Sequence, residues 1–373
     1  MSDLIGEAWT HTGYAQRLHF GAGVVARLPE IVKELGIRRA FFVTTDGRAQ
    51  SDDGLRVARL IGRTLVSSFT EVRSHVPTTV VQAAMQQARR DAVDGVVSFG
   101  GGSCADLGKA VSYFTEQEAG TPGASYADRP ALRHIAIPTT YSGAELTPIF
   151  GMTDERTHTK GGGGGPTSAP IAVVYDPLLT LSTPARVSAE TGMNAMAHCV
   201  EVVYSPQRTP EAEAIALAGI RRLSRALPAV IDDPDDLEAR TDALAGAALA
   251  GRSLENASMG VHHGLAQLVG GRTGIAHGLA NAVILPHAMR FNADVAPDEM
   301  QRIGDALGDP DDPSGAVARL LERLGLPTRL RDCDVDEDDL DAVARMSQSS
   351  PAVQANLRPV GEADARAILD DAW

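Results

Sequence analysis

Histidines gather in a few short segments of the chain, where their imidazoles could transfer protons or bind a metal ion. Five of the ten histidines in the sequence lie there. Asn194 precedes His198 by four residues, a spacing that puts both side chains on one face of a helix. The segments are otherwise apolar, so the rings either line a polar cavity or are buried singly as satisfied core residues. Because several imidazoles recur in this way, we interpret them as the lining of a cavity. They are His198, His262, His263, His277 and His287.

A run of three glycines lies between an apolar segment and a helical pattern. Gly100, Gly101 and Gly102 are followed by Ser103, and Asp106 lies in the first turns of the helical pattern. Glycines let a backbone approach a ligand closely, and the N–H groups at a helix start bind phosphate. The spacing is not the usual G-x-G-x-x-G of dinucleotide sites, so a tight turn without a ligand is the alternative.

Two other polar segments also follow apolar runs. Asp46 ends the run 43–46, where an acidic side chain can accept hydrogen bonds from an adenine ribose and would repel a 2′-phosphate. The alternative is a turn-forming aspartate that caps the next helix, and Arg48 could offset the repulsion. Thr139, Thr140 and Ser142 follow another run, at the edge where open α/β sheets hold ligands. An ordinary polar loop is the alternative there.

The elements that would position these residues alternate in the first half of the chain. Short apolar runs without clean alternation are typical of strands buried on both faces of a parallel sheet. Helical patterns lie between the runs, over residues 25–35 and 80–90. This order predicts an α/β class with a parallel sheet. The predicted strands cover residues 40–44, 95–99, 134–137 and 171–175.

The second half has the three- and four-residue apolar spacing of helices, and it contains no comparable strand-like run. We therefore predict two domains, an α/β domain over residues 1–180 and an all-α domain over residues 181–373. The five-glycine run Gly161–Gly165 is predicted to be a mobile loop, because glycine has the most backbone freedom to lose. The clearest predicted helices cover residues 211–227, 237–250 and 314–324.

Composition limits the class of protein. The chain has 373 residues, 43% of them hydrophobic, and a net charge of -14, from 48 acidic and 34 basic residues. The acidic balance argues against nucleic acid as the main partner. No stretch is apolar enough for a membrane span, and the N-terminus lacks the pattern of a signal peptide. Three cysteines do not make a disulfide framework. We therefore expect a folded cytoplasmic protein that acts on a small molecule.

Taken together, these segments resemble the iron-containing (group III) alcohol dehydrogenase family over nearly the whole chain, and within it the maleylacetate reductase branch. The resemblance implies a Rossmann-like N-terminal domain and an all-α C-terminal domain, the architecture shared with dehydroquinate synthase, and a nicotinamide cofactor, NAD(H) or NADP(H). The matching segments are 20–23, 100–106 with Lys109, 138–140 with Ser142, Gly143 and Glu145, 176–177, 191–198, 263–277 and 285–287.

The resemblance also assigns the cofactor residues. Gly100, Gly101, Gly102 and Ser103 would hold the pyrophosphate, and Asp46 would face the adenine ribose. The remaining positions of the implied cofactor set lie along the adenine and nicotinamide or close to the expected cleft. They are Asp106, Thr139, Thr140, Ser142 and Lys160.

One departure from the family pattern bears on the mechanism. Metal-dependent members bind Fe²⁺ or Zn²⁺ through one aspartate and three histidines, and these positions fall on Asn194, His198, His263 and His277. A neutral carboxamide in place of the carboxylate removes a charged oxygen ligand, so affinity for iron should fall. Three histidines alone can still hold zinc. The resemblance to the maleylacetate reductase branch implies a site without metal, in which these four residues are catalytic.

We therefore predict a metal-independent NAD(P)H-dependent oxidoreductase that reduces a C=C or C=O bond conjugated with a carboxylate. Either Arg272 or Lys160 could pair with the carboxylate of this small acid. One alternative is a metal-dependent alcohol or aldehyde dehydrogenase with a three-histidine site. Another is a lyase or isomerase, because Gly264 and Gln267 depart from the lysine and the histidine usual in relatives. The resemblance further implies a homodimer.

Overall fold

The computed structural model describes residues 9–120, 130–156 and 159–373. It divides into two compact units, one formed by Gly13–Thr183 and the other by Pro184–Trp373 with the N-terminal segment that ends at Thr12. The division after residue 183 differs from the predicted boundary at 180. The N-terminal segment joins the second unit because the Thr12 N–H donates to Asn256 Oδ1 at 2.7 Å.

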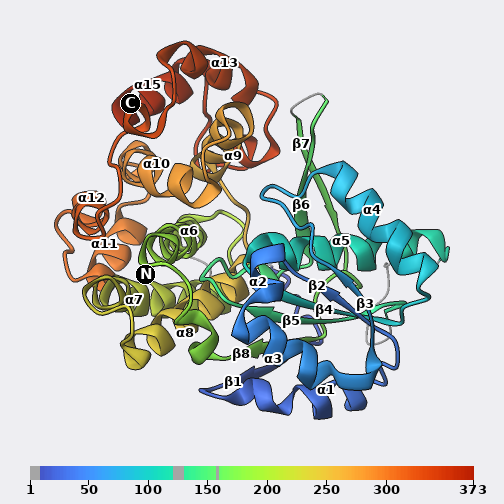
Figure 1. Ribbon diagram of the computed structural model, residues 1–373. Helices are drawn as coiled ribbons and strands as arrows, with labels where there is room; N and C mark the ends of the chain where they lie inside the picture. Colours follow the sequence, from blue (N-terminus) through green and yellow to red (C-terminus); the bar gives the residue numbers. More distant parts are fainter. Residues whose placement is uncertain (1–8, 121–129, 157–158) are drawn as a thin grey trace. The chain divides into compact units, whose positions relative to one another are not determined.

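A six-stranded parallel sheet forms the centre of the first unit (Figure 1). Its order is β1-β8-β5-β4-β2-β3, and every neighbouring pair is parallel. The four predicted strands are β2, β4, β5 and β8, the inner strands of the sheet. The edge strands β1 and β3 were not predicted, because they are short and partly exposed. The strands are β1 (Arg17–Phe20), β2 (Ala40–Val43), β3 (Leu65–Phe69), β4 (Gly95–Gly100), β5 (Arg133–Pro138) and β8 (Ala172–Tyr175).

Helices cover both faces of this sheet, because successive side chains of a strand point to opposite faces. Phe41 and Val43 pack with α4 and α5, whereas Ala40 and Phe42 pack with α1 and α3 on the other side. The helices of this unit are α1 (Leu28–Glu34), α2 (Asp46–Gln50), α3 (Asp52–Ile61), α4 (Thr78–Arg90) and α5 (Gly102–Glu118), with short 3₁₀ turns at Val24–Arg27, Gly62–Thr64, Ala144–Leu146 and Pro177–Thr180.

Gly161–Gly164 lie in a strand, so the prediction of a loop over these four glycines is wrong. β6 (Ile149–Asp154) and β7 (Thr159–Gly164) form a two-stranded antiparallel hairpin, with Gly163 opposite Phe150. A Cβ atom on Gly162 would lie 2.2 Å from the backbone oxygen of Phe150, and one on Gly163 would lie 2.9 Å from the Phe150 ring. Gly162 and Gly163 are thus required by the close packing of the two strands.

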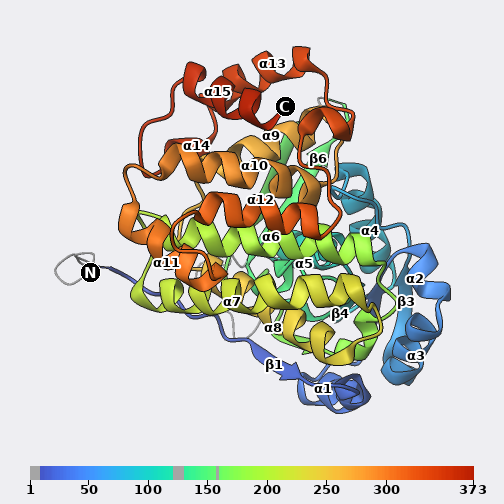
Figure 2. The same cartoon turned by 90° about the vertical axis from the view of Figure 1, so that its left-hand side faces the viewer.

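The second unit is helical in the described residues, as predicted. α7 and α8 pack along α6, and Figure 2 shows these helices beneath α12. Within the described residues, no helix combines the length and apolar character needed to cross a membrane. The helices are α6 (Ala185–Tyr204), α7 (Pro210–Asp232), α8 (Leu237–Leu254), α9 (Val261–Thr273), α10 (His277–Asn292), α11 (Pro297–Leu307), α12 (Pro313–Arg323), α13 (Glu337–Ser347), α14 (Pro351–Gln354) and α15 (Glu362–Ala372), with a 3₁₀ turn at Leu330–Cys333.

The close packing of the hairpin predicts different outcomes for two neighbouring glycines. Gly162→Ala should lower the free energy of unfolding by more than about 1 kcal/mol, because its methyl group collides with a backbone oxygen. Gly161→Ala meets no atom within 4 Å and should change stability by less than about 0.5 kcal/mol. Urea denaturation of both variants measures this, and equal effects would contradict the described pairing.

The buried histidine of the sheet predicts a pH dependence. His134 on β5 lies 2.7 Å from Ser98 Oγ, and burial, followed by the Lys109 charge, lowers its pKa from 6.5 to about 3. Below pH 6.5 the unfolded chain therefore binds a proton that the folded chain does not. The free energy of unfolding thus decreases as the pH is lowered. Each pH unit should remove about 1.4 kcal/mol for this group. His134→Gln should lack this part of the pH dependence. If the free energy of unfolding changes with pH in the same way in both proteins, the assignment to His134 is refuted.

Candidate active site

The carboxyl ends of three neighbouring strands carry the predicted cofactor residues. β4 pairs with both β2 and β5, so these ends lie side by side. The chain continues from β2 to β3 on one side and from β4 to β5 on the other, which makes the edge between β2 and β4 a topological switch point. Open α/β sheets bind ligands in the crevice at such a point. α2 begins at this edge after β2, and α5 begins there after β4.

The glycine run brings backbone close to polar side chains at the start of α5. Gly101 is the N-cap residue, and no side chain caps this 17-residue helix. A Cβ atom on Gly101 would lie 3.2 Å from Thr140 Cγ2, and one on Gly102 would lie 3.0 Å from Ser142 Oγ. Gly100 has φ 141°, a backbone conformation that favours glycine. The uncapped N–H groups beside two hydroxyl residues suit a phosphate.

Buried hydroxyls support a ligand at the same place. Thr139 and Thr140 are buried, and within the described residues their Oγ1 atoms have no hydrogen-bond partner. Buried polar atoms are nearly always satisfied, so a bound molecule would complete them. Lys109, fully buried, contacts Asp106 Oδ1 at 2.7 Å and donates to the oxygens of Ala144 and Ile149. Asp106 is thus the ion-pair partner of the lysine that ties the segment 144–149 to α5.

The structure places the other predicted cofactor residues less directly. Strand β2 ends at Val43 and Asp46 begins α2, so the prediction that Asp46 ends a strand is wrong. Its exposed carboxylate accepts a hydrogen bond from Gln50 Nε2 at 3.0 Å. Arg48 donates to Ser182 Oγ and Thr183 Oγ1. The backbone of Lys160 lies in β7, and its side chain lies outside the described part of the chain.

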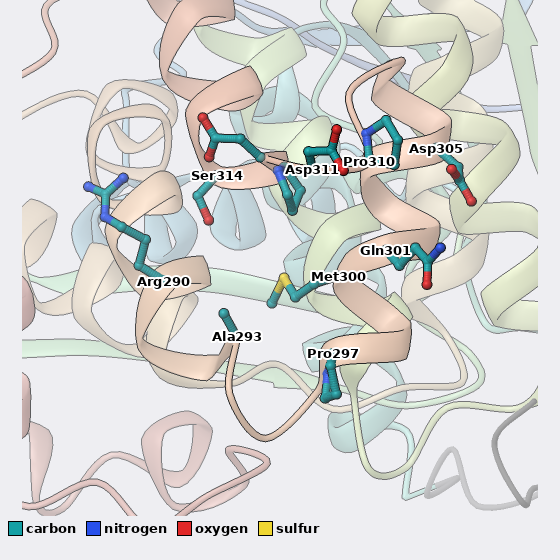
Figure 3. A pocket seen from close by; sticks show the side chains of 11 residues that line it. Arg290, Ala293, Pro297, Met300, Gln301, Asp305, Pro310, Asp311 and Ser314 are labelled. Atoms are coloured by element: carbon teal, nitrogen blue, oxygen red, sulfur yellow. The ribbon is translucent and has the colours of Figure 1, made fainter.

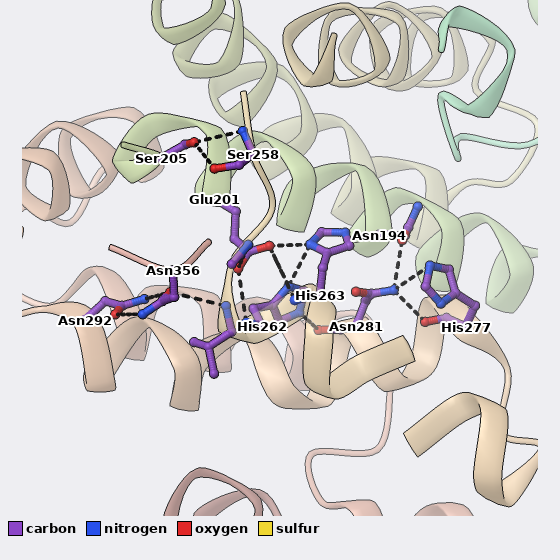
Figure 4. A network of polar contacts seen from close by, with 12 residues as sticks. Asn194, Glu201, Ser205, Ser258, His262, His263, His277, Asn281, Asn292 and Asn356 are labelled. Atoms are coloured by element: carbon purple, nitrogen blue, oxygen red, sulfur yellow. Dashed lines mark hydrogen bonds and ion pairs between the residues drawn. The ribbon is translucent and has the colours of Figure 1, made fainter. Parts of the chain in front are cut away.

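The predicted histidines and Asn194 come from three helices of the second unit. Figure 4 shows Asn194, His263 and His277 among them. α6 carries Asn194 and His198, α9 begins just before His263, and α10 begins with His277. The rings of His198 and His263 stack, with centroids 4.6 Å apart. Burial, followed by the neighbouring His263 and His262, lowers the pKa of His198 well below its usual range. His198 is therefore neutral at physiological pH.

A buried carboxylate that sequence reasoning missed organises this group. Glu201, three residues after His198 on α6, accepts hydrogen bonds from the backbone N–H groups of Gly260, His262 and His263 at 3.1, 3.1 and 3.3 Å. It also lies 2.5 Å from Nδ1 of His263. Burial raises the pKa of Glu201, but the imidazoles of His262 and His263 outweigh it and hold that pKa below its usual range. Glu201 is thus an anion that caps α9. Its spacing from His198 is the signal that could have found it.

The hydrogen bonds assign the protons of two rings. His262 Nε2 lies 2.8 Å from the backbone oxygen of Asn281, which only accepts, so this nitrogen carries a proton. His262 Nδ1 then accepts from His263 Nδ1 at 3.1 Å, and the same proton faces Glu201. Nε2 of His263 is therefore the ring nitrogen directed away from the carboxylate and suited to act on a substrate.

The side chains in these contacts are also of the types that bind metal ions. Glu201, His262 and His263 offer three ligand atoms within 4.8 Å of one another, and histidines 198, 263 and 277 form no such group within the described residues. Two ligands of a tetrahedral zinc ion lie about 3.4 Å apart. The Glu201–His263 separation of 2.5 Å is shorter, and a hydrogen-bonded proton occupies it. As arranged, the trio is a hydrogen-bonded network.

A second amide, also missed from sequence, joins the remaining site residues. Asn281 Nδ2 donates to Asn194 Oδ1 at 3.0 Å and to the backbone oxygen of His277 at 2.8 Å. It also lies 3.1 Å from His277 Nε2. Asn281 is fully buried, one helical turn after His277. The structure therefore connects Asn194 with His277 through this amide.

Other residues singled out from sequence have different surroundings. Arg272 is paired with Asp339 at 2.5 Å, which leaves it poorly placed as a carboxylate partner. His287 contacts Arg290 rather than the other histidines. Gln267 is exposed. A Cβ atom on Gly264 would lie 2.4 Å from Val353 Cγ2, so packing of α9 against α14 requires a glycine there.

A pocket of about 640 Å³ lies among α10, α11 and α12 in the helical unit (Figure 3). Asp305, Asp311 and Asp312 on its wall give it an acidic character, and Arg290 is also part of the lining. None of the predicted cofactor or catalytic residues lines this pocket. The candidate active site is therefore defined by the hydrogen-bonded groups above.

The fold combines a parallel α/β unit with a helical unit that carries the histidines. The chain belongs to the iron-containing alcohol dehydrogenase family. The family description "Iron-containing alcohol dehydrogenase" matches residues 15–177, and "Fe-containing alcohol dehydrogenase family, C-terminal" matches residues 188–373. These matches and the relatives below support an oxidoreductase and give no support to a lyase or isomerase.

Within that family the chain is similar to maleylacetate reductases. It is 37% identical to the maleylacetate reductase of Burkholderia cepacia, over 96% of this chain and 95% of the relative. The crystal structure of maleylacetate reductase from Rhizobium sp. strain MTP-10005 has a TM-score of 0.86 and 33% identity, with 98% of each chain covered. A sulfoacetaldehyde reductase from Bifidobacterium kashiwanohense, solved with NAD⁺, has the same fold, with a TM-score of 0.87 and 23% identity over 98% of this chain and 99% of the relative.

The cap at α9 predicts a large loss of stability when its carboxylate is removed. Glu201→Ala should lower the free energy of unfolding by at least about 3 kcal/mol, because buried N–H donors lose their acceptor. Glu201→Gln keeps one oxygen acceptor and should cost less. Glu190→Ala, on the same helix and paired with the exposed Arg186, is the control and should cost at most about 1 kcal/mol. Equal losses for Glu201→Ala and Glu190→Ala in thermal unfolding would contradict the cap.

Proposed function

We propose that this protein is a metal-independent, NAD(P)H-dependent oxidoreductase that reduces a C=C or C=O bond conjugated with a carboxylate, as maleylacetate reductases do. The observation that carries the proposal is the neutral Asn194, hydrogen-bonded through Asn281 to His277, where metal-dependent members of the family place an anionic ligand. The similarity to maleylacetate reductases over nearly the whole chain supports the substrate class.

The residues at the sheet edge fit the nucleotide. The start of α5 at Gly101 and Gly102 would hold the pyrophosphate, and the buried hydroxyls of Thr139 and Thr140 would bind the same molecule. Asp46 would face the ribose and favour NAD(H) over NADP(H), since Arg48 is already engaged with Ser182 and Thr183. A bound nicotinamide cofactor supplies the hydride.

The helical unit would supply the proton and stabilise negative charge that develops on the substrate. His263 is held by Glu201 through Nδ1, and when the ring is protonated to the imidazolium beside this carboxylate its Nε2–H is the proposed acid. His198 is neutral and stacks on His263, and His277 can donate a second hydrogen bond. Three imidazoles would thus take the place of a Lewis acid.

Metal independence is supported by the bonding of the ligand atoms. The carboxylate of Glu201 and the Nδ1 atoms of His262 and His263 bond to one another, and His277 Nε2 faces an amide. The alternative is a metal-dependent alcohol or aldehyde dehydrogenase, which the Glu201–His262–His263 group favours if its hydrogen bonds open to admit an ion.

Assay after dialysis against a chelator separates the two. NADH oxidation with maleylacetate should persist after EDTA treatment, and NADPH should serve less well. His263→Gln should lower kcat by about 10²–10⁴-fold, whereas His287→Gln, outside the network, is the matched control. Activity that disappears with EDTA and returns with Fe²⁺ or Zn²⁺ would overturn metal independence.

The quaternary structure and the substrate's carboxylate partner stay predictions. We propose a homodimer, which light scattering of the purified protein would test. With Arg272 paired to Asp339, Lys160 is the cation predicted from sequence that is left as a partner for the substrate. Charge reversal at Lys160 should therefore raise the KM for the acid more than the KM for NADH.

A further inference from the structure

Asn281 occupies a central position among the site residues (Figure 4). It lies on α10, one turn after His277, and its side chain is fully buried. Its side-chain amide contacts Asn194 and His277, and its backbone oxygen accepts from His262. One residue therefore touches both the Asn194–His277 part of the site and the His262–His263–Glu201 part.

The orientation of this amide follows from the acceptors around it. The side-chain atom 2.8 Å from the backbone oxygen of His277 must be the nitrogen, because a carbonyl oxygen can only accept. The same nitrogen donates to Asn194 Oδ1 at 3.0 Å. It lies 3.1 Å from His277 Nε2, so the amide hydrogen that points to the His277 backbone oxygen is shared with this ring nitrogen, and an N–H on Nε2 would repel it. Nε2 of His277 must therefore present its lone pair to Asn281.

We propose that Asn281 is a positioning residue that holds His277 in the neutral tautomer with the proton on Nδ1. A neutral imidazole carries one proton, so the acceptor role of Nε2 places that proton on Nδ1. Asn194 supports this arrangement, because its side-chain oxygen accepts from the Asn281 amide and keeps that amide turned toward the His277 ring. Hydrogen bonds of this kind set the ring orientation that a bound ion would otherwise set.

The predicted loss of kcat rests on the proposed function, whereas the predicted tautomer of His277 does not. The tautomer is a property of the resting protein and is visible without turnover. The kinetic effect requires that His277 act on the substrate. Failure of the positioning role can thus be distinguished from failure of the proposed function.

The structural test is long-range ¹H–¹⁵N NMR of the full-length protein labelled on histidine, with His277 assigned by the signal that His277→Gln removes. The native protein should show His277 with its proton on Nδ1, and Asn281→Ala should shift it toward the form protonated on Nε2. Asn292→Ala is the matched control, since it removes another fully buried asparagine of α10, paired with Asn356. That variant should leave the His277 signal unchanged. A native His277 protonated on Nε2 would overturn the proposal.

The kinetic test is a double-mutant cycle in the NADH-dependent assay. Asn281→Ala and Asn194→Ala should each lower kcat by about 10–100-fold with little change in the KM for NADH. The double variant should lose no more than either single variant, because both act through one hydrogen-bonded amide. Asn194→Asp keeps an oxygen acceptor and should retain most of the native tautomer. Fully multiplicative losses would show that the two amides act separately and would refute the proposal.

If no acid substrate is reduced but the tautomer is found, the proposed function fails and the positioning role stands. If the acid is reduced and Asn281→Ala keeps native kcat and the native tautomer, the positioning role alone fails.

Discussion

The carboxylate of Glu201 is the contact on which the helical half of the site depends. It reaches from α6 to the start of α9 and accepts N–H groups of Gly260, His262 and His263. Burying a charge is costly unless it is fully hydrogen-bonded, and a helix N-terminus also favours a negative charge. The same oxygens orient the His263 ring. The hydrogen bonds that tie α6 to the start of α9 and the direction of the His263 ring therefore depend on the same carboxylate.

In the α/β unit, backbone groups rather than a buried carboxylate form the proposed site. Glycines let the start of α5 contact Thr140 and Ser142, and Lys109 holds the segment 144–149 on that helix from within the core. A nucleotide site made of backbone N–H groups tolerates little displacement, because each donor is fixed by the helix. The buried lysine would thus support the proposed site through the segment 144–149. In both units a buried charged group or amide fixes the groups that we propose to meet substrate or cofactor.

The inner strands of the sheet could be predicted because their residues are apolar on both faces, whereas the edge strands β1 and β3 mix exposed and buried positions. The hairpin was missed for a different reason. A glycine run indicates freedom when read alone, but β6 needs residues without a Cβ opposite Phe150. For the site, Asn194 and the histidines were visible as types at helical spacing. Glu201 and Asn281 were not, because each acts through partners far along the chain.

The chain's local patterns thus determined the two-domain class, the inner strands, the family resemblance and the residue types available for chemistry. These depend on neighbours a few positions away, where periodicity and glycine freedom act. Tertiary structure decided which atoms bond to which. It paired Arg272 with Asp339, placed Glu201 at the start of α9 and set the amide of Asn281 against His277. A hydrogen bond depends on ångström-scale distance and direction between groups that only folding brings together.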